Sequence, residues 1–132
     1  MLSRRSAIVL AAASLLASSL PAVARPASFQ AIDSDNDGTI DLDEVKRAAS
    51  KKFDQLDRNR SGTLSRREVG RLRLSRKDFA AADPDNDGTL SKEEYLALVE
   101  KRFKEADTEH KGTLTLKQFN GRAGLPLRRL IY

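Results

Sequence analysis

Apolar residues recur along the chain in one fixed order that repeats four times. Each repeat starts with a phenylalanine, has a second apolar residue three positions later, and has a third eleven positions after the phenylalanine. The four phenylalanines are Phe29, Phe53, Phe79 and Phe103. A repeated supersecondary unit produces such a pattern. We therefore expect the phenylalanines and their apolar companions to form the core.

Polar blocks of twelve residues separate the apolar positions, and each block begins with aspartate. We call them loops 1 to 4, at residues 33–44, 57–68, 83–94 and 107–118. Twelve residues separate loops 1 and 2, and twelve separate loops 3 and 4. One helix of that length is about 18 Å long, at 1.5 Å per residue. Each such helix would leave one loop and enter the next, so its two loops lie at opposite ends.

The linker between loops 2 and 3 differs from the other two. It is fourteen residues long, contains Gly70, and includes Ser75-Arg76-Lys77-Asp78. Glycine weakens a helix, and the Ser-to-Asp spacing resembles a capping box that starts a new one. A break near Leu74 would place loops 2 and 3 side by side and leave loops 1 and 4 to meet at the other end.

Oxygen-bearing side chains occupy positions 1, 3, 5 and 12 of loops 1 to 3, and all four loops have glycine at position 6. Ca²⁺ takes six to eight oxygen ligands, position 7 gives its carbonyl, and a glutamate at position 12 binds with both oxygens. Glycine supplies the positive φ that the tight turn requires. The pattern is typical of the EF-hand, a helix–loop–helix calcium site. The candidate ligands are Asp33, Asp35, Asp37, Thr39, Asp41 and Glu44 in loop 1, Asp57, Asn59, Ser61, Thr63 and Glu68 in loop 2, and Asp83, Asp85, Asp87, Thr89 and Glu94 in loop 3.

The four loops are not chemically equal. Loop 2 has only two charged ligands and contains four arginines, so we expect it to bind more weakly. Loop 4 has Lys111 at position 5 and Gln118 at position 12. We expect it to hold no metal and to serve as a structural partner. The alternative for all four is that they are acidic loops on a solvated surface.

The N-terminus resembles a secretory signal peptide at residues 1–24. Arg4 and Arg5 precede a short apolar run, and Ala22-Val23-Ala24 matches a cleavage site. A Sec or a twin-arginine export route fits this start, because Arg4 and Arg5 are adjacent. A retained membrane anchor is the alternative, although the run is shorter than the ~20 apolar residues of a spanning helix. The remaining residues, 25–132, would form one exported, periplasmic domain.

Composition adds a basic surface and removes several function classes. The chain has a net charge of +5 and no cysteine, so no disulfide supports the fold. The segment 58–77 is rich in arginine and could attract an anionic protein or lipid surface, although a solvated helix face would look the same. No aromatic residues alternate with these arginines, so we expect no nucleic-acid partner. His110 is the only histidine and there is no cysteine, so we find no group of residues that would form a nucleophilic catalytic site. We therefore expect that the protein is not an enzyme. We also expect it to be a monomer.

The chain also resembles the lanmodulin family of periplasmic lanthanide-binding proteins. The likeness lies in the short loop spacing, in DNDGTIDLDE and DPDNDGTLSKEEYLALVEKRFKEAD, in the weak fourth loop and in the closing LPLRRLIY. It implies an all-α fold, a compact three-helix bundle of four closely spaced EF-hand units, with metal sites in loops 1 to 3. It also implies a preference for trivalent lanthanide ions.

Three departures from that family bear on the ion. Proline at position 2 is present only as Pro84, and aspartate at position 9 only as Asp41. The family is acidic, whereas this chain is basic. We therefore expect a Ca²⁺-binding protein of the bacterial cell envelope that folds or stiffens on metal. Lanthanide binding and a basic adaptor for an anionic partner are the alternatives.

Overall fold

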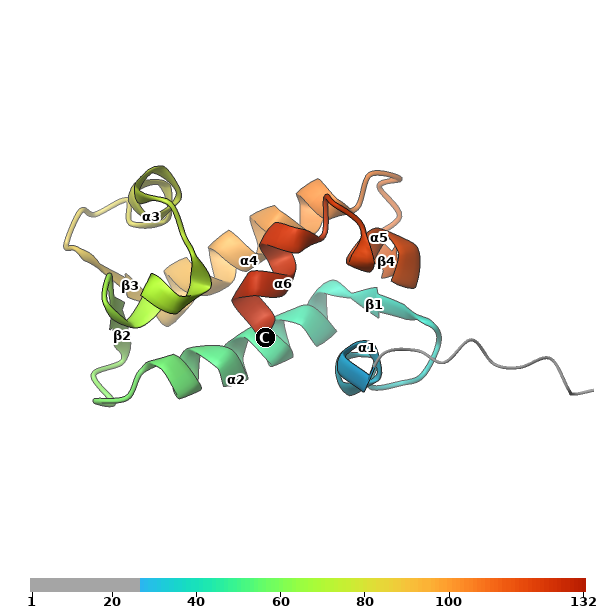
Figure 1. Cartoon of the computed structure of the whole chain (residues 1–132), viewed down its shortest axis with the longest axis horizontal. Helices are drawn as coiled ribbons and strands as arrows, with labels where there is room; N and C mark the ends of the chain where they lie inside the picture. The colour runs from blue at the N-terminus through green and yellow to red at the C-terminus, as the bar shows by residue number, and fades with distance from the viewer. Residues whose placement is uncertain (1–26) are drawn as a thin grey trace, which may run out of the picture.

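The computed structural model describes residues 27–132, which form two long helices, several short helices and four strands (Figure 1). The sequence predicted an all-α fold. The domain is mainly helical, but its four three-residue strands were not predicted. The elements in chain order are α1 (Ala27–Ile32), β1 (Thr39–Asp41), α2 (Leu42–Leu56), β2 (Thr63–Ser65), the 3₁₀ helix η2 (Glu68–Leu72), α3 (Arg76–Ala82), β3 (Thr89–Ser91), α4 (Lys92–Ala106), β4 (Thr113–Thr115), α5 (Leu116–Asn120) and α6 (Leu125–Ile131).

Helices α2 and α4 form the long axis of the molecule and run in opposite directions (Figure 1). Each has fifteen residues and leads from one loop into the next, as the linker lengths predicted. The short helix α6 packs against both of them. Tyr95 of α4 donates a buried hydrogen bond to the carbonyl oxygen of Leu130, which fixes the end of α6 to α4.

The strands join the loops in two pairs, one at each end of the molecule. β1 pairs with β4, and β2 pairs with β3, both antiparallel. Ile40 faces Leu114 in the first pair and Leu64 faces Leu90 in the second, and all four side chains are fully buried. The predicted pairing of loop 1 with loop 4 and of loop 2 with loop 3 is confirmed.

The middle linker breaks where the sequence predicted a break. η2 replaces a long helix after loop 2, and Arg73 then adopts a left-handed conformation with φ of 53°. Ser75 caps α3 by accepting a hydrogen bond from the backbone N–H of Asp78. The Asp78 carboxylate bonds the Ser75 hydroxyl, whereas a full capping box would use the Ser75 backbone N–H.

The core is built from the repeated apolar positions. All five phenylalanines are buried, and two edge-to-face ring pairs lie at opposite parts of the core. Phe29 packs on Phe119 and Phe53 packs on Tyr95, each with ring centroids 5.7 Å apart. Aromatic pairs of this geometry add to the stabilisation that burial gives. The prediction that the phenylalanines form the core is confirmed.

The predicted signal peptide, residues 1–24, lies outside the described residues. Among residues 27–132, no helix has both the length and the apolar character that crossing a bilayer requires.

Candidate metal centre

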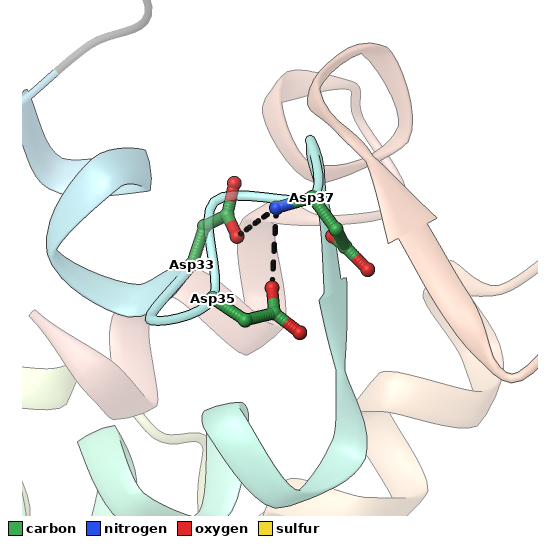
Figure 2. Close-up of side chains that lie close together, drawn as sticks. All are labelled: Asp33, Asp35 and Asp37. Carbon is green, nitrogen blue, oxygen red and sulfur yellow. Dashed lines mark hydrogen bonds between the residues drawn. The ribbon is translucent and has the colours of Figure 1, made fainter.

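Loop 1 brings three carboxylates together between α1 and β1 (Figure 2). Oxygens of Asp33, Asp35 and Asp37 lie within 4.8 Å of one another. The backbone N–H of Asp37 donates to one oxygen of Asp33 and to one of Asp35, both at 3.1 Å. The N–H of Gly38 donates to the other oxygen of Asp33 at 3.0 Å. The loop therefore winds around its own acids, and the three side chains converge on one point.

Two residues of the loop adopt left-handed backbone conformations that allow this winding. Gly38 has φ of 90°, which glycine adopts without a steric penalty. Asn36, at position 4, has φ of 59°, and asparagine tolerates this region better than most residues. The glycine at position 6 was predicted from the sequence, but the left-handed conformation at position 4 was not. The recurring Asn-Asp-Gly of loops 1 and 3 was the available signal.

Glu44, at position 12, closes loop 1. One carboxylate oxygen accepts from the backbone N–H of Asp41 at 3.0 Å. The other accepts from both the backbone N–H and the hydroxyl of Ser34, at 2.8 Å and 3.0 Å. The side chain is almost fully buried. Both ends of the loop therefore meet at this carboxylate.

Asp41 has a structural contact of its own at position 9. Its carboxylate accepts from the backbone N–H of Glu44 at 2.8 Å and caps α2, forming a capping box. Thr39, at position 7, donates its N–H and its hydroxyl to one oxygen of Asp37, at 2.7 Å and 2.8 Å. Asp37 therefore combines this contact with a place in the acid cluster, whereas Asp41 lies outside the cluster.

Loop 3 repeats the acid cluster and the backbone hydrogen bonds of loop 1. Oxygens of Asp83, Asp85 and Asp87 again lie within 4.8 Å of one another. The N–H of Asp87 donates to Asp83 and Asp85, and that of Gly88 donates to Asp83 at 2.9 Å. The Thr89 hydroxyl donates to Asp87 at 2.9 Å.

Glu94, at position 12 of loop 3, accepts fewer hydrogen bonds than Glu44 does at position 12 of loop 1. Glu94 accepts from the backbone N–H of Ser91 at 2.8 Å, just as Glu44 accepts from Asp41. Position 2 is Pro84, which has no N–H to donate, where loop 1 has Ser34. One Glu94 oxygen therefore has no counterpart of the Ser34 contact and is more available as a ligand.

Loop 2 keeps the same backbone but supplies fewer anionic oxygens. Asp57 accepts from the N–H groups of Ser61 and Gly62, each at 2.9 Å. The Ser61 hydroxyl lies 3.2 Å from Asp57 and 2.9 Å from the carbonyl oxygen of Thr63, so it bonds two atoms that would serve as ligands. Asn59 accepts from the Ser61 N–H at 3.1 Å, and Glu68 accepts from Ser65. Among residues 27–132, three-acid clusters are confined to loops 1 and 3.

Loop 4 has the loop fold without the acid cluster. Asp107 accepts from the N–H groups of Lys111 and Gly112, at 3.1 Å and 2.8 Å. The Lys111 ammonium pairs with Glu109, at position 3, with 2.6 Å between nitrogen and oxygen. That pair raises the pKa of Lys111. Gln118 replaces the glutamate and forms a capping box with Thr115.

Charge crowding is visible in the aspartates at position 3. The backbone N–H of Asp37 lowers the pKa of Asp35, but desolvation and the charges of Asp37 and Glu44 together raise it above its ordinary value. In loop 3, a hydrogen bond with Asp83 is the largest cause that raises the pKa of Asp85. A bound cation would relieve this repulsion.

Comparisons with known proteins point to one family. The family model described as EF hand matches residues 27–49, 51–72 and 77–99, about half of the chain. The three segments contain loops 1, 2 and 3 in full. The search of curated proteins found no match.

Proposed function

The chain belongs to the EF-hand family, and on that basis we propose that it is a Ca²⁺-binding module whose principal sites are loops 1 and 3. The convergence of three carboxylates in each of these loops carries the proposal. The donor atoms are all hard oxygens, the ligand type that Ca²⁺ selects. When bound, the ion supplies positive charge that offsets the crowding of the acids. Loop 2 is a weaker site, and loop 4 supports loop 1.

The residues that would hold the ion come from positions 1, 3, 5, 7 and 12. In loop 1 these are Asp33, Asp35, Asp37, the Thr39 carbonyl and Glu44, with Asp41 adding charge at position 9. Glu44 already lies at the junction of both loop ends. The Glu44 carboxylate could exchange its hydrogen bond with the Ser34 N–H for a contact with a bound ion. This exchange would couple metal binding to a stiffer loop and a more stable domain.

The proposed place of action is the bacterial envelope. Its support is the sequence of residues 1–24, which resembles an export signal. Extracellular EF-hand modules bind Ca²⁺ with Kd of about 10⁻⁴ to 10⁻³ M. Sites of that strength fill where Ca²⁺ is abundant, so loop 1 and loop 3 need not be tight.

Lanthanide binding is a second candidate for the same loops. The resemblance to the lanmodulin family and the extra carboxylate of Asp41 support it, because a trivalent ion favours more negative charge. Loop 1 would be the preferred site and loop 2 the poorest. Titrating La³⁺ against excess Ca²⁺ separates the two ions: displacement of La³⁺ by Ca²⁺ at similar concentrations excludes a lanthanide function.

Isothermal titration calorimetry with Ca²⁺ tests the main proposal. Asp35→Asn should weaken binding at loop 1 and Asp85→Asn at loop 3, each leaving the other loop intact. The exposed Asp43, at position 11 of loop 1, provides the matched control, and Asp43→Asn should leave binding nearly unchanged. Heat of binding that is the same in all three variants and the original chain would remove these loops from the account.

A further inference from the structure

A basic groove lies between the C-terminal half of α2, loop 2 with η2, and α6. It has a volume of about 980 Å³. In Figure 1 the ribbon of α6 lies beside α2. Seven cations line it, and six of them, all but Arg128, are Lys52, Arg58, Arg67, Arg71, Arg73 and Arg129. They come from three separate stretches of the chain, so the fold gathers them.

None of these six cations takes part in an ion pair with any residue of the described range 27–132. Some lysines and arginines elsewhere are paired, such as Lys46 with Glu100 and Arg102 with Asp78, whereas others, such as Arg47 and Lys51, have no ion pair within that range. A further lining residue, Arg128, is committed to the carbonyl oxygens of Phe119 and Gly121. The groove therefore concentrates positive charge that the chain itself does not neutralise.

The groove also contains the two large apolar side chains that are exposed in the described part of the chain. Leu125 is 38% exposed and Tyr132 is 43% exposed. Leu56 and Leu72, which belong to the core, form its floor. Apolar side chains next to unpaired arginines are typical of protein interfaces, where aromatic residues and arginine are enriched.

We propose that this groove binds an acidic, amphipathic peptide segment of another protein. Its carboxylates would pair with the six cations, and its apolar side chains would cover Leu125 and Tyr132. The hollow shape favours an inserted segment over a lipid bilayer, which is flat at this scale. Residues 1–26 of the chain contain no acidic residue and do not provide the charge that fits the groove.

Glu68 links this groove to the metal site of loop 2. It is the one carboxylate among the lining residues, and it is also the twelfth residue of loop 2. Uncompensated, its negative charge repels an acidic segment. This regulation rests on the proposed metal function: when Glu68 shares its charge with a cation in loop 2, the groove becomes more positive. The acidic segment should then bind more tightly with Ca²⁺ than with a chelator.

Fluorescence anisotropy with a labelled peptide of Glu and Leu in amphipathic order tests the groove. The purified chain should bind this peptide and not the matching peptide of Lys and Leu. Replacing Arg67 and Arg71 with glutamine should weaken binding by about two- to thirtyfold, since two exposed charge pairs together contribute about 0.4–2 kcal/mol. Higher salt should weaken it further. Arg67 and Arg71 are both exposed, so this variant should keep its fold, as far-UV circular dichroism would verify.

The matched control replaces Arg76 and Lys77, two exposed cations of α3 outside the groove, with glutamine. This variant has the same net charge as the groove variant. Equal peptide binding by the two variants would overturn the groove. Binding to phosphatidylglycerol vesicles without peptide binding would replace the acidic segment with a lipid surface. Self-association that the groove variant loses would replace it with a second copy of this chain.

The link to loop 2 is tested by repeating the peptide titration with Ca²⁺ and with EDTA. Affinity should rise about threefold with Ca²⁺, and Glu68→Gln should bind the peptide tightly in both conditions. Peptide binding in EDTA tests the groove alone, so it can succeed even if the metal proposal fails. A chain that binds Ca²⁺ at loop 2, yet binds peptide equally in both conditions, would refute the link while leaving the groove.

Discussion

At the scale of single residues, the first aspartate of each loop holds the backbone together whether or not the loop has an acid cluster. Asp33, Asp57, Asp83 and Asp107 each accept N–H groups from positions 5 and 6 of their own loop. Loop 4 makes these bonds with a lysine at position 5. An aspartate at position 1 is therefore weak support for a metal site. Positions 3, 5 and 12 decide what a loop can bind.

Loop 4 should gain a metal site when its decisive positions are restored. The double substitution Lys111→Asp with Gln118→Glu removes the Lys111–Glu109 ion pair and completes the acid cluster on a backbone that is already wound correctly. Calcium titration calorimetry should show one additional site per chain. The single substitution Lys111→Ala is the control, because it removes the ammonium without adding a ligand. An unchanged stoichiometry in the double variant would contradict this view of loop 4.

Calcium affinity at loops 1 and 3 should weaken as the pH is lowered. The raised pKa of Asp35 and of Asp85 means that each binds a proton at a higher pH than an ordinary aspartate, whose pKa is about 3.9. Protons then compete with the metal, and affinity weakens as the pH is lowered from about 7 to 5. A chelator-competition assay measures this. Asp35→Asn with Asp85→Asn should bind more weakly but with a flatter pH profile, whereas an equally steep profile would point to other groups.

The positive φ at position 4 of each loop was not predicted from the sequence. Asn36, Arg60, Asn86 and His110 all have positive φ. Arginine lacks the ease with which asparagine and histidine adopt this conformation, so Arg60 carries a local cost of about 1 kcal/mol. The repeat could be predicted from the acids and glycines alone. The positive φ at position 4 was signalled only in loops 1 and 3, by asparagine, because the residues at this position differ among the loops.

At the scale of elements, the paired strands make each metal loop depend on its neighbour. Ile40 and Leu114 are fully buried opposite each other, which connects loop 1 to loop 4. Loops 2 and 3 are joined in the same way by Leu64 and Leu90. A loop without metal ligands can therefore still set the geometry of one that has them.

Leu114→Ala should weaken calcium binding at loop 1, although Leu114 carries no ligand. Truncating a buried leucine costs about 2–5 kcal/mol, and part of that loss should loosen β1. Calorimetry should show a weaker loop 1 site, while loop 3, at the opposite end, is less affected. Leu116→Ala provides a control in a partly buried residue of α5. Equal weakening at both sites would indicate general destabilisation and not coupling through the strands.

Tyr95→Phe should destabilise the domain by about 1–3 kcal/mol. The change removes the hydroxyl that bonds the Leu130 carbonyl and leaves that buried oxygen without its partner. Urea unfolding followed by circular dichroism measures the loss. Tyr132→Phe, at a half-exposed ring, should change stability little. Equal stability of the Tyr95→Phe variant would mean that the hydrogen bond does not anchor α6.

The elements also show what linker lengths predict and what they leave open. Twelve-residue spacings predicted α2 and α4, and the break expected near Leu74 predicted which loops meet. They gave no position for α6, which depends on a tertiary contact from Tyr95 and on a close turn at Gly124. A Cβ at Gly124 would lie 2.2 Å from the carbonyl oxygen of Phe119. No local pattern signals such an approach, since it arises from how α5 and α6 pack.

At the scale of the whole molecule, the acid clusters lie in loops 1 and 3, whereas loop 2 lines the basic groove. The chain carries a net charge of +5 despite its acid clusters. The sequence placed the arginine surplus in residues 58–77, but only the fold adds Lys52 and Arg129 to it. Glu68 is both position 12 of loop 2 and a lining residue of the groove, which makes it the point where metal content and partner binding would meet.

The most direct test of the account measures Ca²⁺ stoichiometry by isothermal titration calorimetry in the original chain and in a variant with Glu44→Gln and Glu94→Gln. Both changes keep side-chain size and the capping contacts to Asp41 and Ser91 while removing the bidentate carboxylates. Asp43→Asn with Glu93→Gln is the matched control at the adjacent exposed positions. The first variant should lose the two strongest sites, and the control should keep them. Undiminished calcium binding in the first variant would contradict it.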